Sequence, residues 1–107
     1  MHRIMKLMAV RHEFYKNNPG VGASELHLLE HIAICETKGV PLCVTDAMKL
    51  KSVASPATIH RYFNTLIEYD LIHTVHDAFD IRIKYIHLTA RGRAYFRKLE
   101  RLLAKML

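Results

Sequence analysis

A change in hydrophobic spacing near residue 70 constrains the fold of this chain more than any other feature. On its N-terminal side, apolar residues recur at the spacing of one helical face, at Ile59, Phe63, Leu66 and Ile67. On its C-terminal side, residues 71–76 and 81–88 are rich in β-branched and aromatic side chains, and the turn-like residues 77–80 separate them. Within the second segment, Ile81, Ile83 and Tyr85 alternate with Arg82 and Lys84, as expected of a strand. The sequence therefore predicts a helix followed directly by a β-hairpin.

Two capping signals define the helices on either side of that hairpin. Ser55-Pro56 places a side-chain cap before a proline at the first helical position, which predicts a helix running to about Tyr69. Thr89 is expected to cap a last helix. The apolar positions of this last helix are Tyr95, Phe96, Leu99, Leu102, Leu103 and Met106.

The first half of the chain predicts three further helices. The first covers roughly residues 3–16 and ends at the breakers of residues 17–20. The second is expected to start at a Ser24 cap and to end at Lys38-Gly39. Its apolar face consists of Leu26, Leu29, Ile32 and Ala33. A short extended segment at 42–44 precedes the third, a brief helix over residues 45–50.

In chain order these elements are helix, helix, short strand, short helix, helix, hairpin and helix. This order predicts an α+β, mainly α fold: a winged helix-turn-helix with flanking N- and C-terminal helices. The 107 residues suit a single domain over 1–107. Its terminal helices, at 1–18 and 90–107, are expected to serve dimerisation.

The charge of the chain is concentrated in its second half. Residues 1–50 carry 6 basic and 5 acidic side chains, net +1, whereas residues 51–107 carry 10 and 5, net +5. An anionic partner is therefore expected, and on charge alone nucleic acid and an anionic membrane surface both qualify. Since no stretch approaches the roughly 20 apolar residues of a bilayer span, we expect no membrane insertion.

The cysteines and the N-terminal segment favour a cytoplasmic location. Cys35 and Cys43 form no CxxC pair, and two cysteines do not make a disulfide scaffold. Lys6 and Arg11 interrupt the apolar character of the first residues, which is not the pattern of a signal peptide. We therefore expect a reducing, intracellular compartment.

The helix that begins at Ser55 leaves a polar face free once its apolar face is buried. That face consists of Ser55, Ala57, Thr58, His60, Arg61, Asn64 and Thr65, with the carboxylate of Glu68 at the far end. Hydroxyl, guanidinium, amide and imidazole groups hydrogen-bond base edges and phosphates. An α-helix also fits the DNA major groove, which is about 12 Å wide. Alternatively, this is the solvated face that any amphipathic helix has.

Three short motifs between Val44 and Gly92 resemble the MarR-type winged helix-turn-helix transcriptional regulators. Residues 55–61, followed by Leu66-Ile67-Glu68 and Leu71-Ile72, are similar to that family's recognition helix and the entry to its wing. Asp80-Ile81-Arg82 resembles its wing Asp-x-Arg, and residues 88–92 resemble its Leu-Thr-x-x-Gly. The order and spacing of the three motifs also fit.

The resemblance implies a role for each matching position. Ser55, Ala57, Thr58 and Arg61 would lie in the major groove of DNA. Arg82 of the wing would enter the minor groove, whose negative potential attracts arginine, with Asp80 orienting the guanidinium. The alternative for Asp80 and Arg82 is an ordinary surface ion pair. The candidate DNA-binding residues are therefore Ser55, Ala57, Thr58, His60, Arg61, Asn64, Thr65, Asp80, Arg82 and Lys84.

The chain departs from the family pattern in two respects. Asp70 stands where the family usually has glycine, and aspartate tolerates the left-handed backbone conformation better than most residues. The chain is also shorter than typical members, which dimerise through extended terminal helices. A homodimer on a pseudo-palindromic operator is expected, although the two terminal helices can instead pack on each other within a monomer.

Our principal hypothesis is a dimeric repressor that acts by occluding its operator. One alternative is a winged-helix module for protein–protein assembly, and another is a compact ArsR-type metal-responsive repressor. His27, His31 and Cys35 recur at four-residue intervals, but successive helical turns cannot converge on one ion without further ligands. Both cysteines are expected to be buried small hydrophobes rather than redox sensors. No pattern indicates a cofactor or an enzyme active site, and a small-molecule effector is left open.

Overall fold

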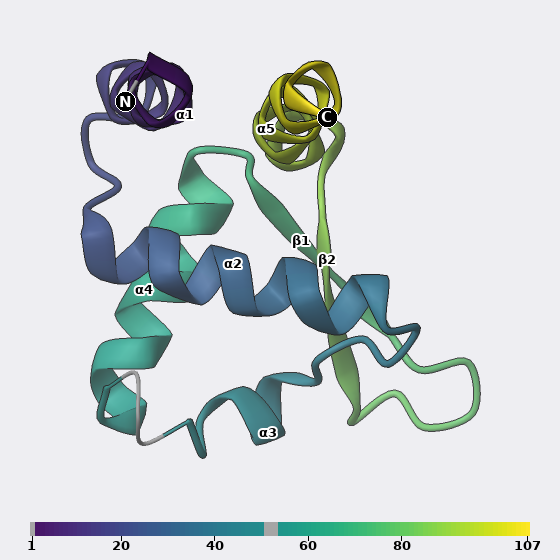
Figure 1. Ribbon diagram of the computed structural model, residues 1–107. Helices are drawn as coiled ribbons and strands as arrows, with labels where there is room; N and C mark the ends of the chain where they lie inside the picture. The colour runs from purple at the N-terminus through teal and green to yellow at the C-terminus, as the bar shows by residue number, and fades with distance from the viewer. Residues whose placement is uncertain (1, 51–53) are drawn as a thin grey trace.

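The computed structural model describes residues 2–50 and 54–107, and within them the chain has the predicted winged helix-turn-helix fold (Figure 1). The sheet is an antiparallel two-stranded hairpin. The elements in chain order are α1 (His2–Asn17), α2 (Ala23–Thr37), α3 (Val44–Ala47), α4 (Pro56–Glu68), β1 (Ile72–His76), β2 (Lys84–Leu88) and α5 (Ala90–Met106). The α+β, mainly α class is confirmed.

The two strongest capping predictions are confirmed. Ser55 is the N-cap of α4, where its side-chain oxygen accepts a hydrogen bond from the Thr58 N–H at 3.4 Å, and Pro56 is the first helical residue. Thr89 caps α5 by accepting from the Gly92 N–H at 3.0 Å. The same Thr89 hydroxyl donates to the carbonyl of Asp70 at 2.6 Å. Each cap satisfies backbone groups that the start of a helix leaves unpaired.

Asp70 adopts the left-handed conformation that its position requires. Its φ is 56°, and the Leu71 N–H that follows donates to the carbonyl of Leu66 at 2.9 Å. A short polar side chain such as aspartate tolerates this region with less strain than most others. The turn from α4 into β1 therefore forms without the glycine that the related motif usually has.

The starts of α2 and α3 differ from the sequence predictions. The N-cap of α2 is Gly22, not Ser24, and the Gly22 N–H donates to the Glu25 side chain at 2.9 Å. Glu25 satisfies this backbone donor from inside the first turn, so the helix starts before Ser24 is reached. The N-cap of α3 is Cys43, which lies in an isolated β-bridge with Tyr85. Because the chain turns into the helix directly from that bridge, Thr45 is inside α3 rather than its cap.

The hairpin is shorter than predicted. Ile72 pairs with Leu88 and His76 with Lys84, so the second strand begins at Lys84 and not at Ile81. The expected alternation from Ile81 to Tyr85 is therefore wrong at its start, and Ile81 is 74% exposed. The physical reason is a closed turn, in which the Ile83 N–H donates to the Asp80 carbonyl at 3.0 Å and the Asp77 N–H to the Ile83 carbonyl at 2.8 Å.

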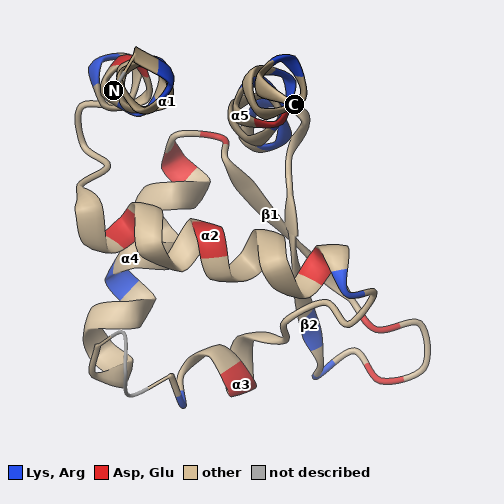
Figure 2. Ribbon diagram, viewed as in Figure 1, with Lys and Arg blue, Asp and Glu red and all other residues tan. Residues whose placement is uncertain are grey.

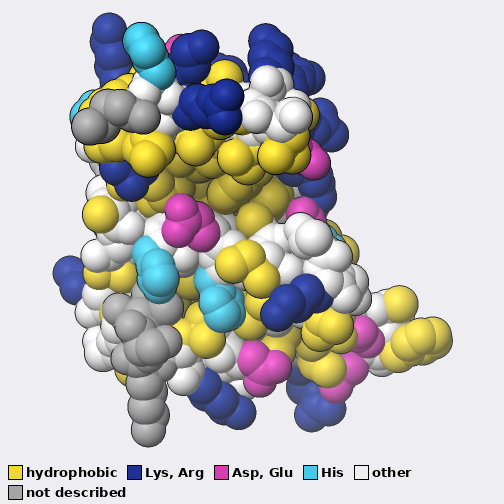
Figure 3. Space-filling view, in the orientation of Figure 1, with side chains coloured by type: hydrophobic (Ala, Val, Ile, Leu, Met, Phe, Trp, Pro, Cys, Tyr) yellow, Lys and Arg dark blue, Asp and Glu magenta, His cyan; other side chains and the backbone are white. Residues whose placement is uncertain are grey.

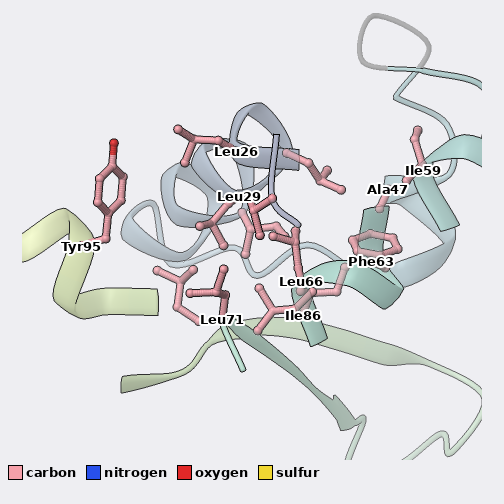
Figure 4. Packing of buried hydrophobic residues seen from close by; sticks show 14 of the residues in the cluster. Leu26, Leu29, Ala47, Ile59, Phe63, Leu66, Leu71, Ile86 and Tyr95 are labelled. Atoms are coloured by element: carbon pink, nitrogen blue, oxygen red, sulfur yellow. The ribbon is translucent and has the colours of Figure 1, made fainter. Parts of the chain in front are cut away.

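The core lies where α2 crosses α4 and the base of the hairpin (Figure 4). Its largest fully buried side chains are Leu28, Leu29, Ile32, Ile59, Leu66, Leu71, Ile72 and Ile86. Leu28 was not among the predicted core residues of α2. The prediction that Ile67 faces inward is wrong, since it is 46% exposed. Its side chain projects about 100° around α4 from the buried Leu66, because helical residues advance by that angle.

The two terminal helices pack side by side above the winged helix (Figure 1). The rings of Phe14 and Tyr95 are in contact, with centroids 4.4 Å apart. Arg91 of α5 donates to the Asn18 side chain at 2.8 Å. The alternative in which these helices pack on each other within one chain is thus present in the structure. Among the described residues, no helix combines the length and apolar character needed to cross a membrane.

Candidate nucleic-acid interface

The polar face of α4 is presented as the sequence predicts. Ser55, Ala57, His60, Arg61 and Asn64 are exposed, and Thr58 and Thr65 are half-buried. The opposite face holds the buried Ile59, Phe63 and Leu66. Packing of these three residues against the core fixes the rotation of α4 about its axis, so its polar face is turned outward.

A small hydrogen-bond network organises the first two turns of α4. The Ser55 hydroxyl donates to the Thr58 hydroxyl oxygen at 3.0 Å, and Arg61 Nη2 donates to the same oxygen at 3.3 Å. The Thr65 hydroxyl donates to the Arg61 backbone carbonyl at 3.2 Å. A guanidinium has five N–H donors, and within residues 2–50 and 54–107 the Arg61 side chain donates only to Thr58. The network directs this cation along the N-terminal half of the helix.

The wing carries an arginine held by a carboxylate. Arg82 Nε donates to Asp80 Oδ1 at 3.0 Å and Arg82 Nη2 to Asp80 Oδ2 at 2.9 Å, while the Arg82 side chain is 87% exposed. The hydrogen bond from the Arg82 side chain, followed by that from its backbone N–H, lowers the pKa of Asp80. The same carboxylate raises the pKa of Arg82. This bidentate geometry fixes the direction of the guanidinium while leaving it in solvent.

Asp77 organises the wing turn, and the sequence analysis did not single it out. One carboxylate oxygen, Oδ2, accepts from the Phe79 N–H at 2.9 Å and from the Asp80 N–H at 3.0 Å. The other oxygen accepts from the Tyr85 hydroxyl at 3.0 Å. These hydrogen bonds, that from Phe79 first, lower the pKa of Asp77. The available signal was an aspartate at the first position of a turn, which commonly binds backbone N–H groups two and three residues on.

The N-terminal end of α4, helix α3 and the wing all lie toward the lower edge of the molecule in Figure 2. Basic residues occur on α4 and on β2 in this view, at Arg61 and Lys84. The acidic residues of the wing are Asp77 and Asp80, and both carboxylates are already bound by donors from the chain itself. In this view the N-terminal end of α4 and the wing thus lie toward the same edge of the fold.

The other candidate clusters form no comparable site. His27 is exposed and His31 and Cys35 are half-buried. Within residues 2–50 and 54–107, no three His, Cys, Asp or Glu side chains are grouped closely enough to hold a metal ion. Cys35 and Cys43 are free thiols and only half-buried, so the expectation that they are buried is not met. Cys35 lies in the last turn of α2, and Cys43 is the N-cap of α3.

No family model matches this sequence, and no curated protein matches it either. Solved structures do match. The transcriptional regulator Tm0710 from Thermotoga maritima aligns over 95% of this chain and 68% of its own, with a TM-score of 0.67 and 16% identity. The DNA complex of S. aureus MepR aligns over 92% and 76%, with a TM-score of 0.64 and 20% identity.

A third structure names the class to which this fold belongs. It is a MarR-like transcriptional regulator from Thermotoga maritima, which aligns over 79% of this chain and 60% of its own, with a TM-score of 0.62 and 19% identity. The fold is therefore that of the MarR-type winged helix-turn-helix regulators. The resemblance inferred from the three short motifs is confirmed at the level of the fold.

Proposed function

We propose that this protein is a sequence-specific double-stranded DNA-binding transcriptional regulator. The observation that carries the proposal is the pairing of two features on one side of the molecule. One is the outward polar face of α4, and the other is a wing whose arginine is held extended by Asp80. The existence of DNA complexes of S. aureus MepR and S. pneumoniae FabT, which share the fold, supports the proposal.

In this proposal, α4 enters the major groove through its N-terminal half. A helix with its side chains is about 10–12 Å across, which matches a groove about 12 Å wide. Arg61 would donate to a base edge, and Ser55, Thr58 and Asn64 would offer hydroxyl and amide groups to bases or phosphates. His60, Ala57 and Thr65 complete the same face.

The wing contributes a second contact in the adjacent minor groove. A narrow minor groove concentrates negative potential, and arginine is the side chain most often inserted there. Asp80 would keep the Arg82 guanidinium oriented during approach. Lys84, which is exposed at the start of β2, is placed for a phosphate contact.

We further propose that the regulator is a homodimer formed by its terminal helices. Apolar side chains remain exposed on α1 and α5 although the two helices pack on each other: Ile4 is 59%, Met5 50% and Leu103 50% exposed. Exposed apolar side chains on two neighbouring helices favour association with a second copy. Two-fold symmetry would present two α4 helices to half-sites about 10 bp apart or a multiple of that spacing. Such a dimer would repress transcription by occupying its operator.

The first experiment is selection of bound duplexes from a random DNA library at about 0.15 M salt, where non-specific binding is weakened. A two-fold symmetric motif is expected. The absence of any enriched motif would overturn the DNA proposal and favour a protein-assembly module with the same fold. A motif without symmetry would leave DNA binding in place but would overturn the dimer.

Arg61→Ala tests the major-groove contact. We expect a loss of about 1–3 kcal/mol on the selected site and a relaxed base preference at one position, because a bidentate contact discriminates between bases. Arg97→Ala is the matched control, since it removes one exposed arginine from α5. Equal losses on selected and random DNA would contradict the assignment of Arg61 to base recognition.

Arg82→Ala tests the wing contact. We expect weaker binding and a reduced preference for A·T-rich flanks, because a narrow minor groove attracts arginine through its potential. Lys84→Ala, by contrast, should weaken binding to all sequences alike and reduce its dependence on salt. If the affinity of the unaltered protein does not depend on flanking sequence, the wing contacts only phosphates.

A further inference from the structure

The end of the wing carries an aromatic side chain with no intramolecular contact surface. Phe79 is 99% exposed, which is the largest exposure of any aromatic residue that the structure describes. Apolar side chains protrude from the loop between β1 and β2 at the lower right of Figure 3. Ile81, in the same loop, is 74% exposed. Because the ring buries almost no surface on folding, it contributes little to the stability of the fold.

The backbone beneath Phe79 is nevertheless held firmly. Its N–H donates to the Asp77 carboxylate at 2.9 Å, and the following Asp80 N–H donates to the same oxygen at 3.0 Å. The Asp77 carboxylate is fixed in turn by the Tyr85 hydroxyl at 3.0 Å. On the far side of the turn, His76 Nδ1 donates to the Ile81 carbonyl at 2.8 Å. These bonds hold the turn in one shape, so the ring is displayed outward by a structured loop.

Phe79 lies three residues before Arg82, the arginine that the proposed function places in the minor groove. Asp80, its neighbour, binds the Arg82 guanidinium through both carboxylate oxygens. Three residues of chain span at most about 11 Å, and successive base pairs are about 3.4 Å apart along the duplex. A wing that delivers Arg82 to the minor groove therefore carries the phenyl ring to within a few base-pair steps of the same point.

Minor-groove binding proteins frequently insert an apolar wedge between base pairs, and phenylalanine is one of the side chains used. The wedge partly unstacks the step and kinks the duplex toward the major groove. The wing has the required parts: a projecting ring, a rigid support, and a neighbouring cation. The charge of Asp80 is offset by its ion pair with Arg82, whereas Asp77 is bound by neutral donors and remains ionised.

We propose that Phe79 is a minor-groove wedge that inserts at a base-pair step beside the Arg82 contact and kinks the operator. This inference rests on the proposed function, since it requires the wing to meet DNA. Pyrimidine–purine steps, TA and CA/TG, unstack most easily. The wedge would therefore favour such a step at a position in the operator where no polar side chain contacts the bases.

The test uses the duplex selected by the 107-residue chain. The duplex carries donor and acceptor dyes at its ends and 2-aminopurine in place of adenine at candidate steps. Binding of the unaltered protein should bend the duplex by roughly 20–90° and raise 2-aminopurine fluorescence at one step. Phe79→Ala should abolish the fluorescence rise and most of the bend. Its affinity should fall by less than about tenfold, because burial of the ring is offset by unstacking of the step.

Two further variants separate a wedge from a change in the loop. Phe79→Leu keeps an apolar wedge and should retain most of the bend. Ile81→Ala removes an exposed apolar side chain two residues away and should leave the bend unchanged. Because Phe79 is exposed, its replacement should not alter the thermal midpoint of the free protein, which controls for folding.

The outcomes distinguish this inference from the function on which it rests. An unaltered protein that selects no DNA overturns both. Specific binding with the same bend and the same 2-aminopurine signal in Phe79→Ala overturns the wedge alone. Equal loss of bending in Phe79→Ala and Ile81→Ala also overturns it, because the loop rather than the ring would then shape the DNA.

Discussion

Replacing Gly92 by alanine tests how α5 is joined to the winged helix. Gly92 is the third residue of α5 and is buried. A Cβ added there would lie 2.3 Å from the carbonyl oxygen of Leu71 and 3.2 Å from its carbonyl carbon. That carbonyl accepts a hydrogen bond from the Thr89 N–H at 3.1 Å. The close approach is thus between two backbone segments that a hydrogen bond already ties together.

The cost of the extra methyl group follows from this geometry. The methyl carbon and the Leu71 oxygen would have to separate by roughly 1 Å, which neither a rotamer change nor a flexible side chain can supply. Overpacking of this kind costs about 1–3 kcal/mol, and a backbone obstacle favours the upper end. The higher helix propensity of alanine relative to glycine offsets up to about 1 kcal/mol of this cost. We therefore expect Gly92→Ala to lower the free energy of unfolding by roughly 2 kcal/mol.

Urea denaturation followed by circular dichroism measures this loss, and the thermal midpoint should fall by roughly 8 °C. Gly39→Ala is the matched control, because Gly39 has a φ of +75° but open space around its Cβ. It should lose only about 1 kcal/mol, from the left-handed conformation alone. A loss in Gly92→Ala no larger than that in Gly39→Ala would refute the argument from close approach.

Two further predictions concern hydrogen bonds. Ser55→Ala should lower the free energy of unfolding by about 1 kcal/mol. Ser24→Ala changes an exposed position that is not a cap and should leave this free energy unchanged. Denaturant titration compares the two variants, and equal losses would contradict the capping assignment. The pKa of Asp77 is lowered below the ordinary 3.8 by its donors, so these bonds stabilise the wing fully above that pH and weaken as pH falls through the lowered pKa. Tyr85→Phe should raise the pKa of Asp77 toward its ordinary value in a carboxyl NMR titration, while an unchanged pKa would show that the hydroxyl contributes nothing.

The predictions that succeeded rest on interactions between residues close in sequence. The Ser55 and Thr89 caps each bind an N–H three residues ahead, and the Asp80–Arg82 pair spans two residues. Asp70 takes its left-handed φ because the turn that follows α4 requires it. The two caps follow from local geometry, whereas the Asp80–Arg82 pair and the Asp70 turn were expected from the resemblance to the MarR-type regulators.

The predictions that failed depended on which local hydrogen bonds form at a turn or helix start, or on how neighbouring elements cover a side chain. The strand expected from Ile81 begins only at Lys84, because Asp77 and Asp80 close the turn with their own hydrogen bonds. Ile67 has the right residue type and nearly the right spacing for the core, yet 46% of its surface remains exposed. A periodic pattern shows which residues can share a face, but not how wide the covering surface is.

The order of elements, the caps of α4 and α5 and the polar character of the α4 face can all be inferred from the sequence alone, because each depends on neighbours within a few positions along the chain. Which side chains remain exposed depends instead on tertiary packing. The projection of Phe79 from a fixed turn and the close approach of Gly92 to Leu71 both belong to this second group. Exposure and interatomic distance are set jointly by every element that packs nearby, so no local pattern encodes them.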